Sequence, residues 1–224
     1  MIKQLKYISL ASFCMLFAFS GEIATASNDF KKELQLGASF SSSFSSVSLQ
    51  PAINQKMLMG FGGGASLRWI TEKHLGLQVE LNYTQKGWSE MYEETPQFFY
   101  DRTINYLEMP LMTHIYFGKK NFRFIFNLGP KIAFMLNETT RDNLNGERPN
   151  KENTQHGMPV ENRFDWGLCG GPGIELRTGI GSFVLEGRYY FGLGDFYGNR
   201  SEDYFSKSSH QVISAKMTWF LPAF

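Results

Sequence analysis

The chain has 224 residues, which is room for one domain of ordinary size, and its formal net charge of +1 provides no basic stripe for nucleic acid. After the N-terminal segment, no stretch reaches the roughly 18 to 20 consecutive apolar residues that a membrane-spanning helix requires. A helical membrane protein and a nucleic-acid-binding protein are therefore excluded. A β-barrel is allowed, because its strands alternate apolar and polar residues and average to a modest hydrophobicity.

The N-terminus has the pattern of an export signal. Two lysines precede an apolar run over residues 7–19, and small residues in an A-x-A pattern follow at 24–26. We expect cleavage after Ala26, so that residues 1–26 are a signal peptide and residues 27–224 form one mature domain. A short membrane anchor is the alternative, which the short run and the cleavage pattern disfavour.

The two cysteines predict neither a disulfide nor a metal site. Cys14 lies in the signal segment, so only Cys169 remains in the mature domain. Cys14 follows Phe13 where a lipid-attachment signal needs a small residue, and we therefore exclude a lipoprotein. One cysteine and four scattered histidines do not have metal-ligand spacing. We predict no metal site, no cofactor site and no catalytic residue.

Eight segments of the mature domain have the pattern of β-strands. In residues 75–86 every second residue is apolar and the residues between them are small, polar or charged, a period of two that indicates a strand with two different faces. The same alternation recurs in seven further segments. In chain order the eight predicted strands are 33–41, 58–69, 75–86, 104–117, 121–134, 163–177, 182–192 and 210–220.

The connections between these strands alternate in length. Short turns lie around 71–74, 118–120 and 179–181, and long polar loops cover 42–57, 87–103, 135–162 and 193–209. Outer-membrane barrels have this layout, with short periplasmic turns and long external loops. The Ser-rich stretch 41–46 is assigned to the first long loop.

The charged residues of the predicted strands share the polar face. Arg or Lys in the middle of the hydrocarbon costs roughly 2–4 kcal/mol, so in a membrane barrel this face points inward. A soluble barrel would instead expose it to water, but the export signal and the loop lengths favour the membrane. The charged set is Arg68, Glu80, Lys86, Glu108, Arg123, Lys131, Asp165, Glu175, Arg177, Glu186, Arg188 and Lys216.

We therefore predict an all-β fold, an eight-stranded antiparallel up-and-down transmembrane β-barrel that is monomeric and surrounded by outer-membrane lipid. Aromatic residues fall at both ends of the strands, as in the girdles of such barrels. An eight-stranded barrel is only just wide enough for side chains to fill it. We expect a salt-bridged interior, with a narrow ion path as the alternative.

Four sequence motifs resemble the PorT-type outer-membrane β-barrel family of Bacteroidetes, whose members are often called porins. They are LGLQVELNYTQKG at 75–87, YLEMPL at 106–111, GP at 129–130 and DWGLCGGPG at 165–173. The resemblance implies an eight-stranded outer-membrane barrel and, for the founding branch, a role in protein secretion and gliding. Such barrels usually end on an aromatic residue of the last strand, which here is either Phe220 or Phe224.

The positions of the histidines do not predict a catalytic site. Small outer-membrane barrels that modify lipids need a histidine with a serine and a carboxylate in reach. His114 shares a polar face with Glu108, but six residues of strand separate them by roughly 20 Å. His74 lies in a short turn, and His156 and His210 lie in or beside long loops. We expect no enzymatic activity.

Recognition is expected instead at the long loops. The loops 87–103 and 193–209 are rich in aromatic and acidic residues. Such aromatic residues can bind a protein or a glycan, or they can pack on each other as a lid. The leading hypothesis is a non-enzymatic outer-membrane barrel with a structural or recognition role, which the family resemblance would connect with protein secretion. The alternatives are an outer-membrane lipid-modifying enzyme and a soluble lipocalin-like periplasmic binder.

Overall fold

The computed structural model describes residues 31–92, 95–147, 155–198, 200 and 203–222. The predicted signal peptide lies outside these residues, and so does Phe224. From Lys32 onward the described residues belong to one compact unit built from β-strands. Within the part of the chain that is described, no helix is long and apolar enough to cross a membrane.

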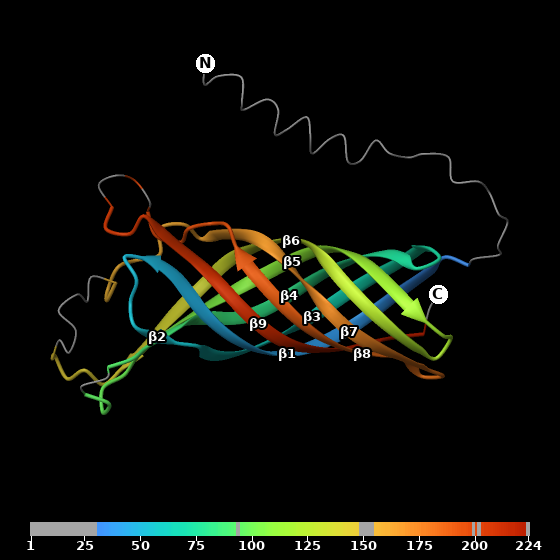
Figure 1. Cartoon of the computed structure of the whole chain (residues 1–224), viewed down its shortest axis with the longest axis horizontal. Coiled ribbons are helices and arrows are strands. Elements are labelled where there is room, and N and C mark those ends of the chain that lie inside the picture. The colour runs from blue at the N-terminus through green and yellow to red at the C-terminus, as the bar shows by residue number, and fades with distance from the viewer. Residues whose placement is uncertain (1–30, 93–94, 148–154, 199, 201–202, 223–224) are drawn as a thin grey trace, which may run out of the picture. The chain divides into compact units, whose positions relative to one another are not determined.

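Nine strands make up this unit (Figure 1). They are β1 Glu33–Gln50, β2 Gln55–Lys56, β3 Leu58–Glu72, β4 Leu75–Glu90, β5 Tyr100–Gly118, β6 Phe122–Asp142, β7 Phe164–Thr178, β8 Gly181–Gly192 and β9 Lys207–Phe220.

The eight long strands close on themselves. Each pairs antiparallel with its neighbours in the order β4-β3-β1-β9-β8-β7-β6-β5, and a further pairing between β4 and β5 joins the two ends. The short strand β2 pairs with the last residues of β4, beyond the point where β3 leaves it. The predicted up-and-down barrel is confirmed, with β2 as an addition that the sequence pattern did not reveal.

Several strands are longer than the alternation predicted. β1 continues to Gln50 through the Ser-rich stretch that was assigned to a loop, and β6 continues to Asp142. The loop assignment of 41–46 was wrong because serine replaces the large inward residues there. In the structure Ser41 pairs with Gly62 and Ser43 with Gly60, so small residues meet on both strands. On the other side of β3, a Cβ built at Gly64 would lie 2.0 Å from the Leu81 carbonyl oxygen of β4, so a side chain there would collide with that strand.

The two faces of the wall are those that the sequence predicted. Along β4 the apolar Leu77, Val79 and Leu81 are exposed on the outside, whereas Gln78 and Glu80 between them are buried in the lumen. Ten of the twelve charged residues of the predicted polar face are buried, and Arg123 and Arg177 are half-buried. An exposed apolar exterior around a buried charged interior is the reverse of a soluble protein and fits a barrel in lipid.

Aromatic side chains form two outward belts. Near the short turns, Trp69, Phe117 and Trp219 are exposed, and near the long loops Phe40 and Phe134 are exposed. Two exposed belts at opposite ends of the strands are the arrangement that the sequence predicted as aromatic girdles. We call the two ends of the barrel the short-turn end and the long-loop end.

This assignment of faces can be tested with single cysteines at Val79 and Phe124 in a Cys169→Ala background. We expect a lipid-soluble thiol reagent to label both positions in intact membranes and a water-soluble reagent to leave them unmodified, since both side chains face hydrocarbon. Arginine at either position should impair assembly, because the charge costs roughly 2–4 kcal/mol near the midplane. Ready labelling by the water-soluble reagent would show that the faces are assigned wrongly.

Candidate functional site at the long-loop end

The middle of the lumen is filled by a network of paired charges around Glu80. Both Nη atoms of Arg188 donate to the Glu80 carboxylate, at 2.9 and 2.8 Å, and Lys216 donates to the same group. Arg188 also donates to Glu186 at 2.8 Å. All four side chains are buried or nearly so, and they join β4, β8 and β9 across the interior.

A second network lies closer to the long-loop end. The Lys86 Nζ atom is 3.0 Å from Glu108 Oε1 and 2.7 Å from Asp165 Oδ2, and Lys131 donates to the other Glu108 oxygen at 2.9 Å. Lys131 also stands over the ring of Tyr190 at 3.6 Å from its centroid. This network connects β4, β5, β6 and β7.

The short-turn end has its own ion pair. Arg68 Nη1 lies 3.1 Å from Glu175 Oε1, and the Arg68 Nε atom donates to Gln78 at 2.8 Å. The guanidinium also stacks over the Phe220 ring at 3.9 Å. Phe220 is the last residue of β9 and is fully buried, so it closes this end of the lumen.

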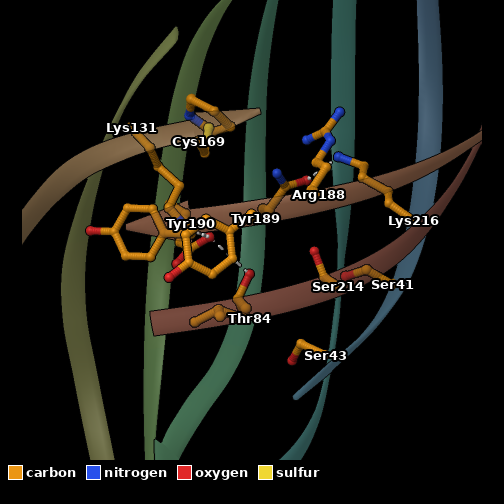
Figure 2. Close-up of a pocket in the computed structure, with 14 residues that line it drawn as sticks. Ser41, Ser43, Thr84, Lys131, Cys169, Arg188, Tyr189, Tyr190, Ser214 and Lys216 are labelled. Carbon is orange, nitrogen blue, oxygen red and sulfur yellow. Dashed lines mark hydrogen bonds and ion pairs between the residues drawn. The ribbon is translucent and has the colours of Figure 1, made fainter. Parts of the chain in front are cut away.

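Little free space is left between these networks. A cavity of about 50 Å³ lies between the two, bordered on one side by Arg188 and Lys216 and on the other by Lys131 and Tyr190 (Figure 2). A space of this size holds only a few water molecules. The predicted filled, salt-bridged interior therefore agrees with the packing of the described residues.

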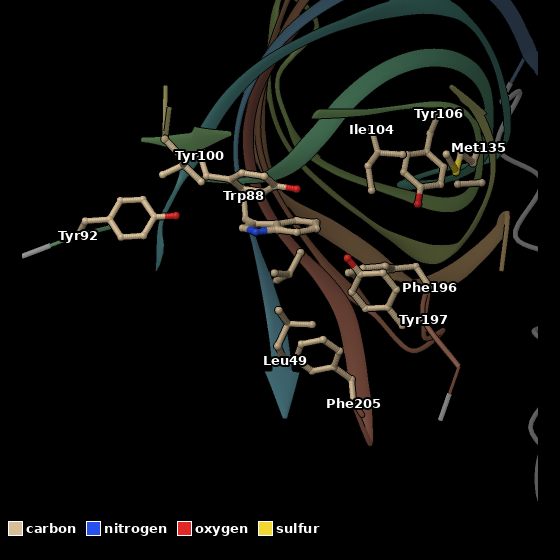
Figure 3. Packing of buried hydrophobic residues seen from close by; sticks show 13 residues of the cluster. Leu49, Trp88, Tyr92, Tyr100, Ile104, Tyr106, Met135, Phe196, Tyr197 and Phe205 are labelled. Carbon is tan, nitrogen blue, oxygen red and sulfur yellow. The ribbon is translucent and has the colours of Figure 1, made fainter. Parts of the chain in front are cut away.

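Above the charges, the long-loop end is closed by a buried aromatic cluster that we call the aromatic cap (Figure 3). Trp88 stacks on Phe196 with ring centroids 5.9 Å apart, and Tyr197 stacks on Phe205 at 5.4 Å. Of the two roles left open for the aromatic loops, these rings have the packing of a lid. The cap consists of Val47, Leu49, Trp88, Tyr92, Tyr100, Ile104, Tyr106, Ala133, Met135, Leu144, Phe196, Tyr197 and Phe205.

Arg102 fastens the loops to the cap. Its guanidinium donates to the Tyr197 hydroxyl at 2.8 Å and to the Met158 carbonyl at 2.6 Å, and its Nε and Nη2 atoms donate to Glu138 at 2.9 and 2.6 Å. Tyr197 and Met158 come from two different long loops. A single buried side chain on β5 thus holds both loops over the lumen.

Glu90 is the acidic counterpart of Arg102. Its buried carboxylate accepts hydrogen bonds from Trp88 at 3.3 Å, Tyr92 at 3.0 Å and Gln155 at 3.0 Å, and it lies 2.8 Å from His156 Nε2. Burial alone would raise the pKa of the Glu90 carboxyl, but the hydrogen bonds from His156 and Gln155 outweigh it and lower the pKa. As a carboxylate, Glu90 therefore ties the long loop 135–162, through Gln155 and His156, to β4.

Beside the cap, a groove of about 500 Å³ opens at the tip of β4, β5 and β6, and we call it the rim groove. Its apolar wall includes Tyr92, Phe98 and Phe99, and the Glu90 carboxylate, which the cap already engages, also lines it. Its remaining charged residues are Lys56, Asp101 and Arg141. None of these three charged side chains makes an ion pair or side-chain hydrogen bond within the described ranges. They differ in this from the charges of the lumen, which are nearly all paired.

The histidines lie apart from one another. His114 Nδ1 lies 2.8 Å from Asn127 Oδ1, whereas Glu108 is engaged by lysines, so the pair named in the sequence does not come together. His74 contacts the Tyr116 carbonyl, and His210 contacts the Tyr106 hydroxyl. In the part of the chain that is described, no histidine is hydrogen-bonded to a serine, and no three or more His, Cys, Asp or Glu residues cluster as metal ligands.

The sequence did not reveal Glu90, Arg102, Lys56 or Arg141 as site residues. Lys86, Trp88 and Glu90 continue the inward alternation of β4 beyond its apolar part, and that continuation was the available signal. It went unnoticed because the outward partners there are polar, so that the hydrophobic period disappears. The structure brings the aromatic residues of loops 87–103 and 193–209 together, as the loop composition allowed.

A closed barrel with an apolar exterior, a paired-charge lumen and long loops at one end defines an outer-membrane β-barrel protein. The model of the family described as outer membrane protein beta-barrel domain matches residues 24–198, and the chain belongs to this family. Its location is accordingly the outer membrane. This overturns the alternative of a soluble periplasmic binder. No curated protein sequence matches the chain.

Solved structures with a similar arrangement include three outer-membrane proteins. OprG from Pseudomonas aeruginosa is 14% identical, with 86% of this chain and 95% of that chain covered and a TM-score of 0.48. Outer Membrane Protein W of E. coli is 13% identical, with 86% and 99% covered and a TM-score of 0.43. The outer membrane enzyme PagL is 11% identical, with 82% and 99% covered and a TM-score of 0.44.

The ion pair between Arg68 and Glu175 should behave as a coupled unit. Arg68→Met alone leaves a buried carboxylate without its partner, and we expect a loss of about 3–5 kcal/mol in unfolding free energy. The double variant Arg68→Met/Glu175→Met should recover most of this loss, because no unpaired charge remains. Urea unfolding of the refolded protein in detergent micelles measures both values, and equal losses in the single and double variants would contradict the pairing.

The cap should loosen in acid through Glu90. Because its folded-state pKa is lowered, the carboxylate stabilises the cap above the usual glutamate pKa of about 4.3, and this contribution is lost as pH falls through the lowered value. We expect Trp88 fluorescence, recorded with the other three tryptophans replaced by Phe, to change over that acidic range. Glu90→Gln should show the loosened signal already at pH 7.

Glu147→Gln is the matched control for this prediction, since Glu147 is exposed at the same end of the barrel. Its Trp88 signal should follow that of the parent protein at every pH. An unchanged acid response in Glu90→Gln would show that another group controls the cap.

Proposed function

We propose that this protein is a non-enzymatic, monomeric outer-membrane barrel that recognises a ligand at the cell surface through its long-loop end. The observation that carries the proposal is a contrast within the described residues. The lumen charges are paired and capped, whereas Lys56, Asp101 and Arg141 stand unpaired around an aromatic groove. Unpaired charges beside aromatic rings in a concave site are typical of ligand binding. Transport through the lumen has no comparable support.

The lipid-modifying enzyme is the alternative from another class. Its chemistry needs a nucleophile next to a histidine that a carboxylate orients. His156 has a carboxylate partner in Glu90, but its ring stacks on Tyr100 with centroids 3.8 Å apart, and Glu90 is engaged by three further donors. This arrangement supports a structural tie between loop and strand.

The PorT-type affiliation and the secretion role are the finer part of the proposal. Their support is that three of the motifs behind the resemblance, at 75–87, 106–111 and 165–173, supply Lys86, Glu108 and Asp165 to a single network. If the affiliation extends to function, the recognised ligand belongs to protein export. Deletion of the gene should then alter the set of secreted proteins, and an unchanged set would restrict the role to recognition.

The absence of transport and of catalysis can be measured on one preparation of the mature protein. In planar bilayers we expect no stable conductance, because paired side chains and the cap obstruct the lumen. Incubation with phospholipid and lipopolysaccharide should leave both unchanged by mass spectrometry. Porin-sized channels, or release of acyl chains that is lost in His156→Ala, would overturn the proposal.

A further inference from the structure

We propose that the rim groove binds the acidic saccharide portion of a glycolipid of the outer leaflet, an inference that rests on the proposed recognition function and specifies its ligand. The first support is the placement of the charges in one row. Lys56 pairs in register with Ser89, Ser89 with Asp101, and Asp101 with Arg141. Residues directly opposite each other on antiparallel strands project from the same face of the sheet. The row therefore runs across four strands on one surface.

This surface is the outer one, continuous with the lipid-facing side of the barrel. Along β5 the exposed apolar positions end at Leu107, and Asn105, Thr103 and Asp101 continue the outward positions with polar side chains. The inward positions between them, Ile104 among them, are buried in the cap. The groove charges thus stand at the side of the barrel, where neighbouring lipids reach them.

The height of the row above the hydrocarbon indicates which part of the surrounding lipids lies beside it. Asp101 is six residues beyond Leu107, roughly 20 Å along the strand and about 15 Å along the membrane normal at a typical barrel tilt. The headgroup layer on one side of a bilayer is only about 5–8 Å thick. The row therefore lies beyond phospholipid headgroups, at the level of the sugars that outer-leaflet glycolipids carry.

The composition of the groove fits a saccharide with an acidic group. Lys56 and Arg141 donate hydrogen bonds and attract a carboxylate or phosphate, and Asp101 accepts hydrogen bonds from hydroxyl groups. Phe98 and Phe99 provide apolar rings for the C–H face of a pyranose. A nucleotide triphosphate concentrates several negative charges that Asp101 would repel, and a fatty acid, whose carboxylate could pair with one of the two cations, has no hydroxyl groups for Asp101 to accept hydrogen bonds from.

The aromatic wall is held in place before any ligand binds. Asn143 on the β6 side accepts a hydrogen bond from the Phe99 backbone nitrogen at 2.7 Å, and its side-chain amide donates to the Gln97 carbonyl at 2.6 Å. The backbone nitrogen of Asn143 in turn donates to the Phe99 carbonyl at 3.3 Å. A preorganised wall reduces the entropy lost on binding.

The test uses the mature protein in phosphatidylcholine nanodiscs and calorimetric titration with lipid-free oligosaccharide released by mild acid from lipopolysaccharide of the native strain. We expect saturable binding at one site. Arg141→Gln, Asp101→Asn and Phe98→Ala should each weaken it about tenfold or more, as expected for loss of a charged hydrogen bond or a stacking ring. Lys119→Gln, which removes a cation at the short-turn end, should bind like the parent protein.

Each other outcome contradicts a defined part of the inference. Binding that the three groove variants leave unchanged would place the saccharide elsewhere. Equal binding of dextran, a neutral polysaccharide, would exclude an acidic glycolipid as the preferred ligand. If no saccharide binds while the protein still shows neither conductance nor lipid cleavage, the ligand class is wrong and the proposed recognition function is unaffected. Retained heat-modifiable migration in electrophoresis confirms that each variant is folded.

Discussion

Lys86 occupies a demanding position, with a fully buried ammonium group inside the barrel toward its long-loop end. An unpaired charge there would cost several kcal/mol, so the carboxylates of Glu108 and Asp165 must meet it. The three residues come from β4, β5 and β7, and a shift of one residue in the register of any of these strands would turn its charged group toward lipid. The pairing of buried charges therefore fixes strand register as well as lumen packing. It also explains why the motifs that resemble a known family concern the construction of the barrel more than a reactive site.

The filled lumen has a direct consequence for function. Between the ion networks, below the aromatic cap, the described residues border a cavity of about 50 Å³. The charged groups around it are engaged with one another. The long-loop end, in contrast, holds charged groups without protein partners beside Phe98 and Phe99. The charges that hold the barrel together and the charges that the proposed recognition would use are thus different residues.

The parts of the fold that could be predicted are those where lipid imposes a pattern. Between Leu75 and Tyr83 the hydrocarbon requires apolar side chains outside, and the period of two gives both the strand and its faces. Above the bilayer, water accepts polar side chains on the outside, and the pattern ends although the strand continues to Glu90. The same reason hides the upper part of β6, and the small side chains of residues 41–46 hide the upper part of β1. The rim groove was not predictable, because it depends on cross-strand register between β2, β4, β5 and β6.

The inward–outward alternation of side chains nevertheless continues above the membrane, where the two faces have different surroundings. Trp88 and Glu90 point inward and hold the cap, while Ser89 between them belongs to the outward row with Asp101. On β5, Arg102 fastens two loops from the inside while its neighbour Asp101 faces the groove. In the bilayer the period of two separates lipid from lumen, and beyond it the same period separates the face that packs into the cap from the face that carries the proposed binding groove. The segment 87–103 can therefore contribute both to the cap and to the proposed binding groove, since the strand geometry points successive residues to opposite faces.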